Sequence, residues 1–162
     1  MLKSFYVLPG KVTKEFKFRE FQYKVLNFLI NTNLLLKKKQ LKTTDVCDFC
    51  HGAIENMYHL FYGCEHSKKF WEILEKYWKD KTTESVNITL KDVILGNTIF
   101  PDLLNYLIIL GKHFIFKSKL ELMLPLFVIF KYTISVKYEF EKYVSVKDNS
   151  EEKFKLRWMF EP

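Results

Sequence analysis

The chain has 162 residues, of which 48% are hydrophobic and 17% aromatic, and its formal net charge is +7. This length and hydrophobic content are enough to bury a core, which argues against an intrinsically disordered protein. The positive charge lies mainly in residues 1–64, whose ten Lys/Arg against five Asp/Glu favour polyanionic partners over acidic metabolites, although a solvated lysine-rich surface would give the same balance.

The first predicted helix begins near Thr13, a residue type that is common at helix N-caps. Apolar residues then recur at helical spacing at Phe18, Phe21, Val25, Phe28 and Leu29. The run NTN at 31–33 is expected to end this helix, and Asn33 is expected to cap a short turn over LLLKKK.

All three cysteines and three of the four histidines lie in the stretch that follows. The spacing Cys47-x2-Cys50-x8-His59-x4-Cys64 supplies three thiols and one imidazole, which is the ligand set of a closed tetrahedral zinc site. The Cys-x-x-Cys step lets two sulfurs reach one ion from a single tight turn, and Gly52 allows the backbone to fold back. His59 and Cys64 are expected about one turn apart at the start of a helix. The sequence therefore predicts a structural zinc ion.

Other interpretations of these residues fit less well. A redox Cys-x-x-Cys pair would be expected within a βαβ pattern, which is not found here. An iron–sulfur cluster usually takes four cysteines, and a catalytic zinc site keeps one position open. His51 or His66 could replace His59, because spacing alone does not exclude them. Otherwise these two and His113 are expected to be ordinary surface or core histidines.

A second long helix is predicted over residues 67–80, beginning at Ser67. Its apolar stripe consists of Phe70, Trp71, Leu74, Tyr77 and Trp78. Residues 81–87 read as a loop, and a short helix follows over 89–96. In that helix Thr89 and Asp92 approximate a capping box, and Gly96 stands where a helix ends.

The remaining chain is predicted to form two apolar helices, over 102–119 and 124–147, and a last helix that starts at Ser150. Pro101 and Pro125 are expected in the first turns of the two apolar helices. In the last helix, Glu151 and Glu152 open the first turn, and Phe154 and Trp158 supply apolar contacts.

The predicted fold class is mostly α: a helical domain with an embedded small zinc-knuckle segment of CCHC-type ligands. Residues 1–80 would form the zinc-binding region with its flanking helices, and residues 81–162 a helical tail packed on it, the two making one continuous domain. The apolar stretches 103–116 and 122–130 are broken well short of the ~18 uncharged residues that a membrane span needs. No signal peptide is recognised at the N-terminus. Three cysteines in an unsecreted chain favour an intracellular location, in the cytoplasm or nucleus.

Several motifs occur in a characteristic order: FQYK at 21–24, TN at 32–33, Cys-x-x-Cys, HLF at 59–61, a cysteine three residues later, and FW at 70–71. In this order they resemble the zinc-binding region near the C-terminus of LINE-type (non-LTR) retrotransposon reverse transcriptases. LPGKVTKEFKFREFQYK looks like the lead-in to that region, and ITLKDVILGN, LIILGKHFIFKSK and EKFKLRW look like the tail that follows it. Two departures, Asn56 where the family usually has Thr and PG at 9–10, touch no ligand.

The resemblance implies a zinc-binding accessory domain that binds element RNA or target DNA during target-primed reverse transcription, beside the rest of a reverse transcriptase polypeptide. No catalysis is expected, because the chain has no adjacent Asp pair of the kind that holds a polymerase's metal ions. Pro101-Asp102 and Glu151-Glu152-Lys153 match a restriction-like nuclease signature poorly, since both lie in predicted helices. The alternatives are a structural or protein-interaction helical module stabilised by zinc, or an inactive copy of a decayed element.

Under this interpretation, lysines near the cysteine segment are the candidate phosphate contacts. They are Lys37, Lys38, Lys39 and Lys42, with Lys14, Lys17, Arg19 and Lys24 extending the surface along the first helix. Phe49, inside the Cys-x-x-Cys step, either stacks on an unpaired base or packs beneath the zinc turn.

Overall fold

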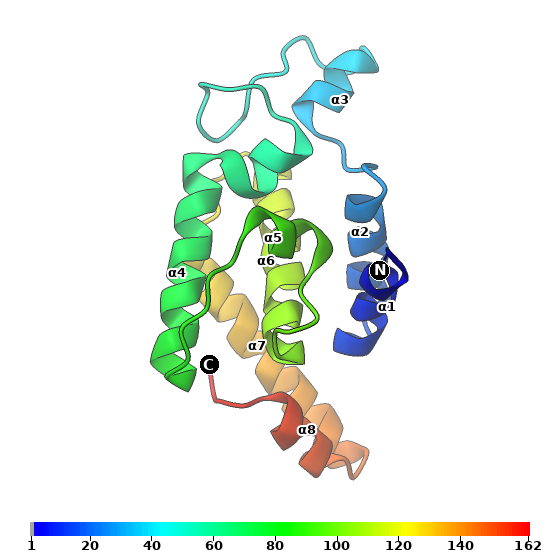
Figure 1. Cartoon of the computed structure of the whole chain (residues 1–162), viewed down its shortest axis with the longest axis vertical. Coiled ribbons are helices and arrows are strands. Elements are labelled where there is room, and N and C mark those ends of the chain that lie inside the picture. The colour runs from blue at the N-terminus through cyan, green and yellow to red at the C-terminus, as the bar shows by residue number, and fades with distance from the viewer. Residues whose placement is uncertain (1) are drawn as a thin grey trace.

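The computed structural model describes residues 2–162, with side chains described from Phe5 onward. Its helical elements in chain order are α1 (Leu2–Val12), α2 (Phe16–Leu26), α3 (Asn33–Lys38), the π-helical turn η1 (His59–Gly63), α4 (Glu65–Thr82), α5 (Leu90–Leu95), α6 (Asp102–Leu120), α7 (Phe127–Lys147) and α8 (Glu151–Arg157) (Figure 1). Within the described residues the β-structure is limited to one isolated antiparallel bridge, between Val46 and Ile54. The predicted mostly α fold is confirmed.

Helix α6 is the centre of this fold. It contacts α1, α2, η1, α5 and α7, and every residue from 103 to 112 is buried. A helix that is apolar on all sides is stable only when other elements surround it, and α6 is surrounded in this way. Figure 1 shows the cysteine segment and α3 at one end of the molecule and α8 at the other. The part of the chain described here holds no helix with the length and hydropathy of a membrane span.

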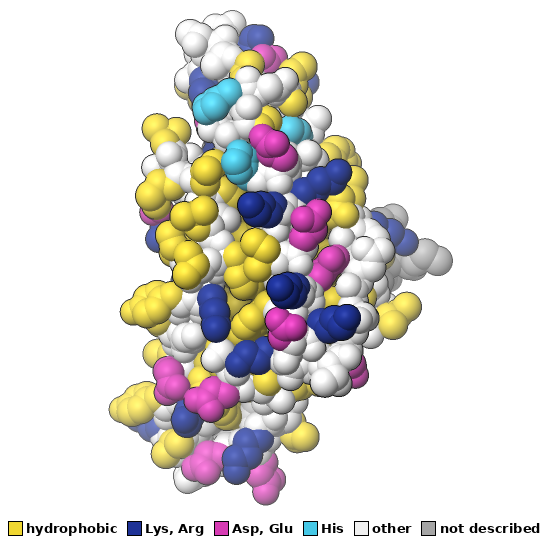
Figure 2. Space-filling view, turned by 90° about the vertical axis from the view of Figure 1, so that its left-hand side faces the viewer, with side chains coloured by type: hydrophobic (Ala, Val, Ile, Leu, Met, Phe, Trp, Pro, Cys, Tyr) yellow, Lys and Arg dark blue, Asp and Glu magenta, His cyan; other side chains and the backbone are white. Residues whose placement is uncertain are grey.

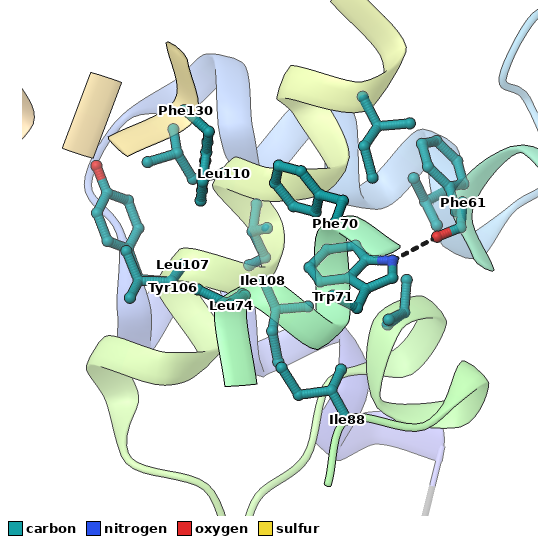
Figure 3. Packing of buried hydrophobic residues seen from close by; sticks show 14 of the residues in the cluster. Phe61, Phe70, Trp71, Leu74, Ile88, Tyr106, Leu107, Ile108, Leu110 and Phe130 are labelled. Carbon is teal, nitrogen blue, oxygen red and sulfur yellow. Dashed lines mark hydrogen bonds between the residues drawn. The ribbon is translucent and has the colours of Figure 1, made fainter. Parts of the chain in front are cut away.

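The predicted apolar stripe of α4 forms one wall of the core. All five of its residues are buried, and the Phe70 ring lies 4.9 Å from the Phe130 ring between centroids (Figure 3). Gly111 lets α4 pack closely on α6, because a Cβ placed there would lie 3.0 Å from both Phe70 and Trp71. The stripe was therefore predicted correctly, although α4 begins two residues earlier than expected.

Local signals in the second half also predicted the helix ends correctly. Thr89 and Asp92 form a capping box at the start of α5, and Gly96 follows the last helical residue with a φ of 81°. Ser150 is the N-cap of α8, with Glu151 and Glu152 in its first turn. Carboxylates placed there interact favourably with the helix dipole.

Three predicted helix starts are wrong by one or two residues. The N-cap of α2 is Glu15, and the Thr13 hydroxyl accepts a hydrogen bond from the Glu15 N–H (3.1 Å) in the turn before it. Thr32, rather than Asn33, caps α3. Ser67 lies inside α4, where its buried hydroxyl donates to the Leu60 carbonyl (2.6 Å). In each case a tertiary or turn contact competes with the local capping preference.

Other expectations fail where a helix ends early or starts late. Helix α2 ends at Leu26, and Phe28 adopts a left-handed φ of 57°, so that Phe28 and Leu29 point outward and are exposed. Pro125 lies before α7, whose N-cap is Leu126. Trp158 is buried but follows the end of α8.

Helix α6 carries a lysine, Lys112, that is fully buried in the core of the protein. Its ammonium group donates a hydrogen bond to the Gln22 side-chain oxygen, and the Gln22 amide donates to the Ile94 carbonyl (2.9 Å). Burial lowers the pKa of Lys112 to about 7. A lysine in the unfolded chain keeps its proton up to a pH of about 10.4, so the two states bind different numbers of protons between these values.

The free energy of unfolding is accordingly expected to rise with pH between about 7.5 and 9.5, by up to ~1.4 kcal/mol per pH unit, because the unfolded state holds the additional proton. Below about pH 7 both states are protonated, and Lys112 contributes no slope. Urea denaturation at several pH values, on the native chain and on Lys112→Met, measures this effect. The variant should lose the slope, and an identical slope in the two proteins would contradict the assignment.

Candidate metal centre

Cys47 and Cys50 lie on a tight knuckle that the Val46–Ile54 bridge closes. The Cys47 N–H donates to the Ala53 carbonyl (2.8 Å), and the His51 N–H donates to the Cys47 carbonyl (3.0 Å). His51, not Gly52, takes the left-handed conformation that reverses the chain, with a φ of 53°. The predicted role of Gly52 in this turn is therefore wrong.

His59 and Cys64 flank η1, the π-helical turn. The Cys64 N–H donates to the His59 carbonyl (2.8 Å), so the hydrogen bond spans five residues where an α-helix spans four. A four-residue spacer between two ligands matches one such turn, which brings both side chains to the same side. Cys64 is also the N-cap residue of α4.

Helix α4 supplies hydrogen-bond donors to the carbonyls at this turn. The Ser67 hydroxyl donates to the Leu60 carbonyl (2.6 Å), and the Trp71 indole N–H donates to the Phe61 carbonyl (2.6 Å; Figure 3). Leu60, Phe61 and Trp71 are all buried. Because buried carbonyls without donors are costly, these two bonds stabilise the irregular turn on which His59 lies.

The structure brings Cys47, Cys50, His59 and Cys64 together. Each offers one ligand atom, and these four atoms lie within 4.8 Å of one another. The Cys47 and Cys64 sulfurs are 4.0 Å apart, and the Cys50 sulfur is 3.4 Å from His59 Nε2. Zinc–sulfur and zinc–nitrogen bonds of about 2.3 and 2.0–2.1 Å give tetrahedral edges of about 3.8 Å between sulfurs and about 3.6 Å between sulfur and nitrogen. The residues therefore fit a zinc ion.

The choice among the histidines follows from the same geometry. His59 is the histidine whose ring reaches the three thiols, whereas His51 is exposed and His66 lies beside Glu65 (3.7 Å). His113 packs edge-on against Phe18 and Phe21, with centroid distances of 5.1 and 5.2 Å. The ligand role of His59 stays a prediction.

The pKa values of the two buried thiols are shifted in opposite directions. A hydrogen bond with Cys64 and burial raise the pKa of Cys47, while the same hydrogen bond and the backbone amides of His66 and Ser67 lower the pKa of Cys64. The Phe49 N–H also points at the Cys47 sulfur (3.4 Å).

Burial lowers the pKa of His59, which favours the neutral imidazole that metal binding requires. A tetrahedral ion bound by these four side chains would have no open position, which is the arrangement of a structural zinc site.

A buried ion cluster joins this segment to the core helix α6. Glu55 is fully buried, and its carboxylate accepts the N–H groups of Asn33 (2.9 Å) and Asp48 (3.3 Å). Lys119, near the end of α6, lies 3.4 Å from Glu55 and 3.4 Å from Asp48, and donates to the Asn33 side-chain oxygen (2.9 Å). The cluster thus connects the cysteine loop, α3 and α6.

Asp48 extends this cluster to the surface. Its carboxylate accepts hydrogen bonds from Lys42 (2.7 and 3.0 Å). Burial acts to raise the pKa of Asp48, but the Lys42 and Asn33 hydrogen bonds and the charge of Lys119 outweigh it, so the pKa is lowered. Asp48 lies between the two cysteines of the Cys-x-x-Cys step, so the ion cluster is attached directly to the metal knuckle.

The candidate phosphate contacts differ in whether their charged groups already have a partner in the chain. Lys37 is 3.1 Å from Asp45, Lys42 is paired with Asp48, and Lys39 donates to the Asn31 side-chain oxygen (3.5 Å). On α2, Lys24 is 2.8 Å from Glu20 and Lys17 is 3.7 Å from Glu15, the N-cap residue of this helix. Among the described residues no ion pair involves Lys14, Arg19 or Lys38, and all three are exposed.

Phe49 is not accessible to a nucleic-acid base. Its side chain is only 5% exposed and belongs to the hydrophobic core. A stacking role needs an accessible ring face, so this expectation is corrected. Packing beneath the knuckle, the other interpretation of Phe49, agrees with its burial.

Comparison with known proteins adds one match. Residues 9–71 match the family described as zinc-binding in reverse transcriptase, and this range contains all four candidate ligands and the α3 lysines. No match was found among curated proteins or solved structures.

Proposed function

We propose, from the premise that residues 9–71 are a zinc-binding domain of the reverse-transcriptase type, that this chain binds RNA or DNA during target-primed reverse transcription of a LINE-type element. The zinc-binding domain is an accessory domain, not a catalytic one. Its metal would be a structural zinc ion held by Cys47, Cys50, His59 and Cys64. Such a role would place the chain in the cytoplasm or nucleus, beside the polymerase.

The observation that carries this proposal is the attachment of a lysine-rich helix to the metal loop. Asn33, the first residue of α3, donates its N–H to Glu55 and its side-chain amide to the Val46 carbonyl (2.7 Å). Lys37 is paired with Asp45, also on the loop. A zinc ion that fixes the loop would therefore fix α3, whose Lys38 and Lys39 are exposed at the same end of the molecule (Figure 1).

Contacts of this kind recognise the phosphate backbone rather than a base sequence. Lys38 and Lys39 have no carboxylate partner among the described residues and can approach a phosphate directly. Lys37 and Lys42 would have to exchange an aspartate for a phosphate, so their net contribution is smaller. Binding should therefore be sensitive to salt, with about 0.7–0.9 units of log K lost per lysine contact per decade of salt.

The test compares two charge-matched double variants. Lys38→Gln with Lys39→Gln removes two charges beside the metal loop, and Lys153→Gln with Lys155→Gln removes two from α8 at the other end (Figure 1). Fluorescence anisotropy with a single-stranded oligouridine and with a DNA duplex, over a range of salt concentrations, gives affinity and salt slope. The α3 variant is expected to bind roughly tenfold or more weakly, with a slope smaller by one to two units, while the α8 variant binds as the native chain does.

Two outcomes would contradict the proposal: no measurable binding by the zinc-loaded native chain, or an equal loss in both variants. Equal losses would mean that binding follows overall charge and not the α3 surface. A preference for RNA or for DNA decides which of the two is the ligand.

A second candidate function is a helical interaction module that zinc stabilises. The exposed apolar surface of residues 120–146 favours it, since the proposed phosphate contacts use none of these residues.

A further inference from the structure

Large apolar side chains are exposed throughout residues 120–146. On α7 they are Val128, Ile129, Tyr132, Val136, Phe140, Tyr143 and Val146, and before α7 they are Leu120, Leu122, Met123, Leu124 and Leu126. Figure 2 shows hydrophobic side chains gathered in a band on one face of the molecule, beside a surface of alternating charge. Scattered apolar residues are normal on a protein surface, but a continuous set of this size is not.

Helix α7 is apolar on two opposite sides. Phe130 and Ile134 are fully buried against the core, and the exposed residues lie on the other side of the same helix. A helix on the surface of a monomer normally turns polar residues to water, whereas a helix that is apolar all round is covered on all sides. The sequence of α7 is therefore that of a helix with neighbours on both faces.

The area of this face is comparable to that of a protein interface. Tyr132, Phe140 and Tyr143 are 72%, 62% and 69% exposed, so at about 150–250 Å² per ring they hold roughly 400 Å² between them. The exposed aliphatic residues bring the face to the order of 800 Å², which is what each partner of a standard interface buries.

We infer that this face pairs two copies of this chain through their α7 helices. Ile129, Tyr132, Val136, Tyr143 and Val146, with Glu139 completing the series, follow alternating steps of three and four residues. Residues with that spacing form the seam along which two helices pack side by side. A second copy of α7 carries the same seam, so the two surfaces can match. The inference is independent of nucleic-acid binding, because it uses no residue of the metal loop.

Charge decides the direction of pairing. In a parallel pair, Glu139 would face Glu139 of the second copy, and Lys142 would face Lys147. An antiparallel pair places Glu139 opposite Val136 and Lys142 beside Ser135, which removes both like-charge contacts. The two copies therefore lie antiparallel, with a twofold axis between Val136 and Glu139.

Anionic membrane is the other surface that an apolar helix with flanking lysines could contact. Glu139 lies within the exposed stripe and would approach the lipid headgroups together with the apolar side chains. A carboxylate there opposes binding to a negatively charged surface, and for this reason the observations favour a second copy.

Sedimentation equilibrium of the full zinc-loaded chain, from low micromolar to submillimolar concentration, tests the inference. The native chain is expected to be dimeric. Val136→Glu places a second carboxylate opposite Glu139 of the other copy and should weaken the dimer about 100-fold or more, while Glu139→Leu removes the one charge in the seam and should tighten it about tenfold. Ile99→Glu is the matched control, because Ile99 is 88% exposed outside the seam, and it should leave the dimer unchanged.

Circular dichroism confirms that each variant is folded before its mass is measured. A native chain that is monomeric at every concentration would overturn the inference, as would a dimer that Val136→Glu and Ile99→Glu weaken equally. Co-sedimentation with phosphatidylserine vesicles by a monomeric native chain, lost in Val136→Glu, would also overturn it and assign the face to membrane.

Discussion

Replacing His59 with alanine is expected to release the metal and to unfold the loop between α3 and η1, with α3 following. Within residues 39–56 the described backbone has a single isolated bridge and a few turns, so a metal ion, the Glu55 cluster and the packing of Phe49 are the main contacts that hold the two cysteines in place. Structural zinc contributes about 10–16 kcal/mol to the folding of small zinc-binding segments at neutral pH, which exceeds what the remaining contacts of this loop can supply.

His66→Ala is the matched control for this prediction. Both residues are half-buried histidines near the start of α4, but the His66 ring lies beside Glu65 and outside the sulfur cluster. Hydrogen exchange resolved by segment should show fast exchange over residues 33–64 in His59→Ala, or in the native chain with a chelator, and native protection in His66→Ala. Equal losses in the two alanine variants would refute the assignment of His59 as the ligand.

Removing the buried carboxylate of Glu55 should also destabilise the fold, though by less than the loss of zinc. Glu55→Ala leaves two backbone N–H groups without their acceptor and removes one of the two carboxylates beside the buried ammonium of Lys119. Removing one partner of a buried ion pair costs about 3–5 kcal/mol, and the loss here is expected near the lower end because Asp48 still lies 3.4 Å from Lys119. Urea denaturation with saturating zinc gives this change in the free energy of unfolding.

Two comparisons sharpen the Glu55 prediction. The double variant Glu55→Leu with Lys119→Met should lose less stability than the sum of the single changes, since neither charge is then left alone. Glu72→Ala, at an exposed carboxylate in the middle of α4, should change stability by no more than about 0.5 kcal/mol. A loss below about 1 kcal/mol in Glu55→Ala would mean that the cluster does not anchor the loop.

Features that depend on local sequence were predicted well. The α4 stripe follows from the spacing of apolar residues, the α5 capping box from Thr89 and Asp92, and the convergence of the three cysteines with a histidine from their spacing, which left His51 and His66 open beside His59. Each of these depends on residues close together in the chain, where helix geometry limits the possible arrangements.

Features that depend on tertiary contacts were not predicted. Lys112 and Lys119 are charged residues in a helix read as apolar, and their partners Gln22 and Glu55 lie far away in the sequence. The α1 helix carries Pro9 and Gly10, both unfavourable inside a helix, so the sequence gives no local signal for it. The π-helical turn was missed because a four-residue spacer reads equally well as part of an ordinary helix.

The structure makes the metal loop and the helical core depend on one another. Trp71 and Ser67 of α4 hold the turn that carries His59, and Lys119 of α6 holds the loop that carries Cys47 and Cys50. Zinc would therefore fix more than its own loop. It would set the position of α3 relative to the core.

Metal content together with X-ray absorption at the zinc edge, on protein purified without added metal, tests the central claim most directly. One zinc per chain, bound by three sulfurs at about 2.3 Å and one nitrogen at about 2.0–2.1 Å and absent from Cys50→Ser, is the predicted result. A native chain that folds fully without metal, or a Cys50→Ser variant that retains one zinc with unchanged coordination, would contradict it.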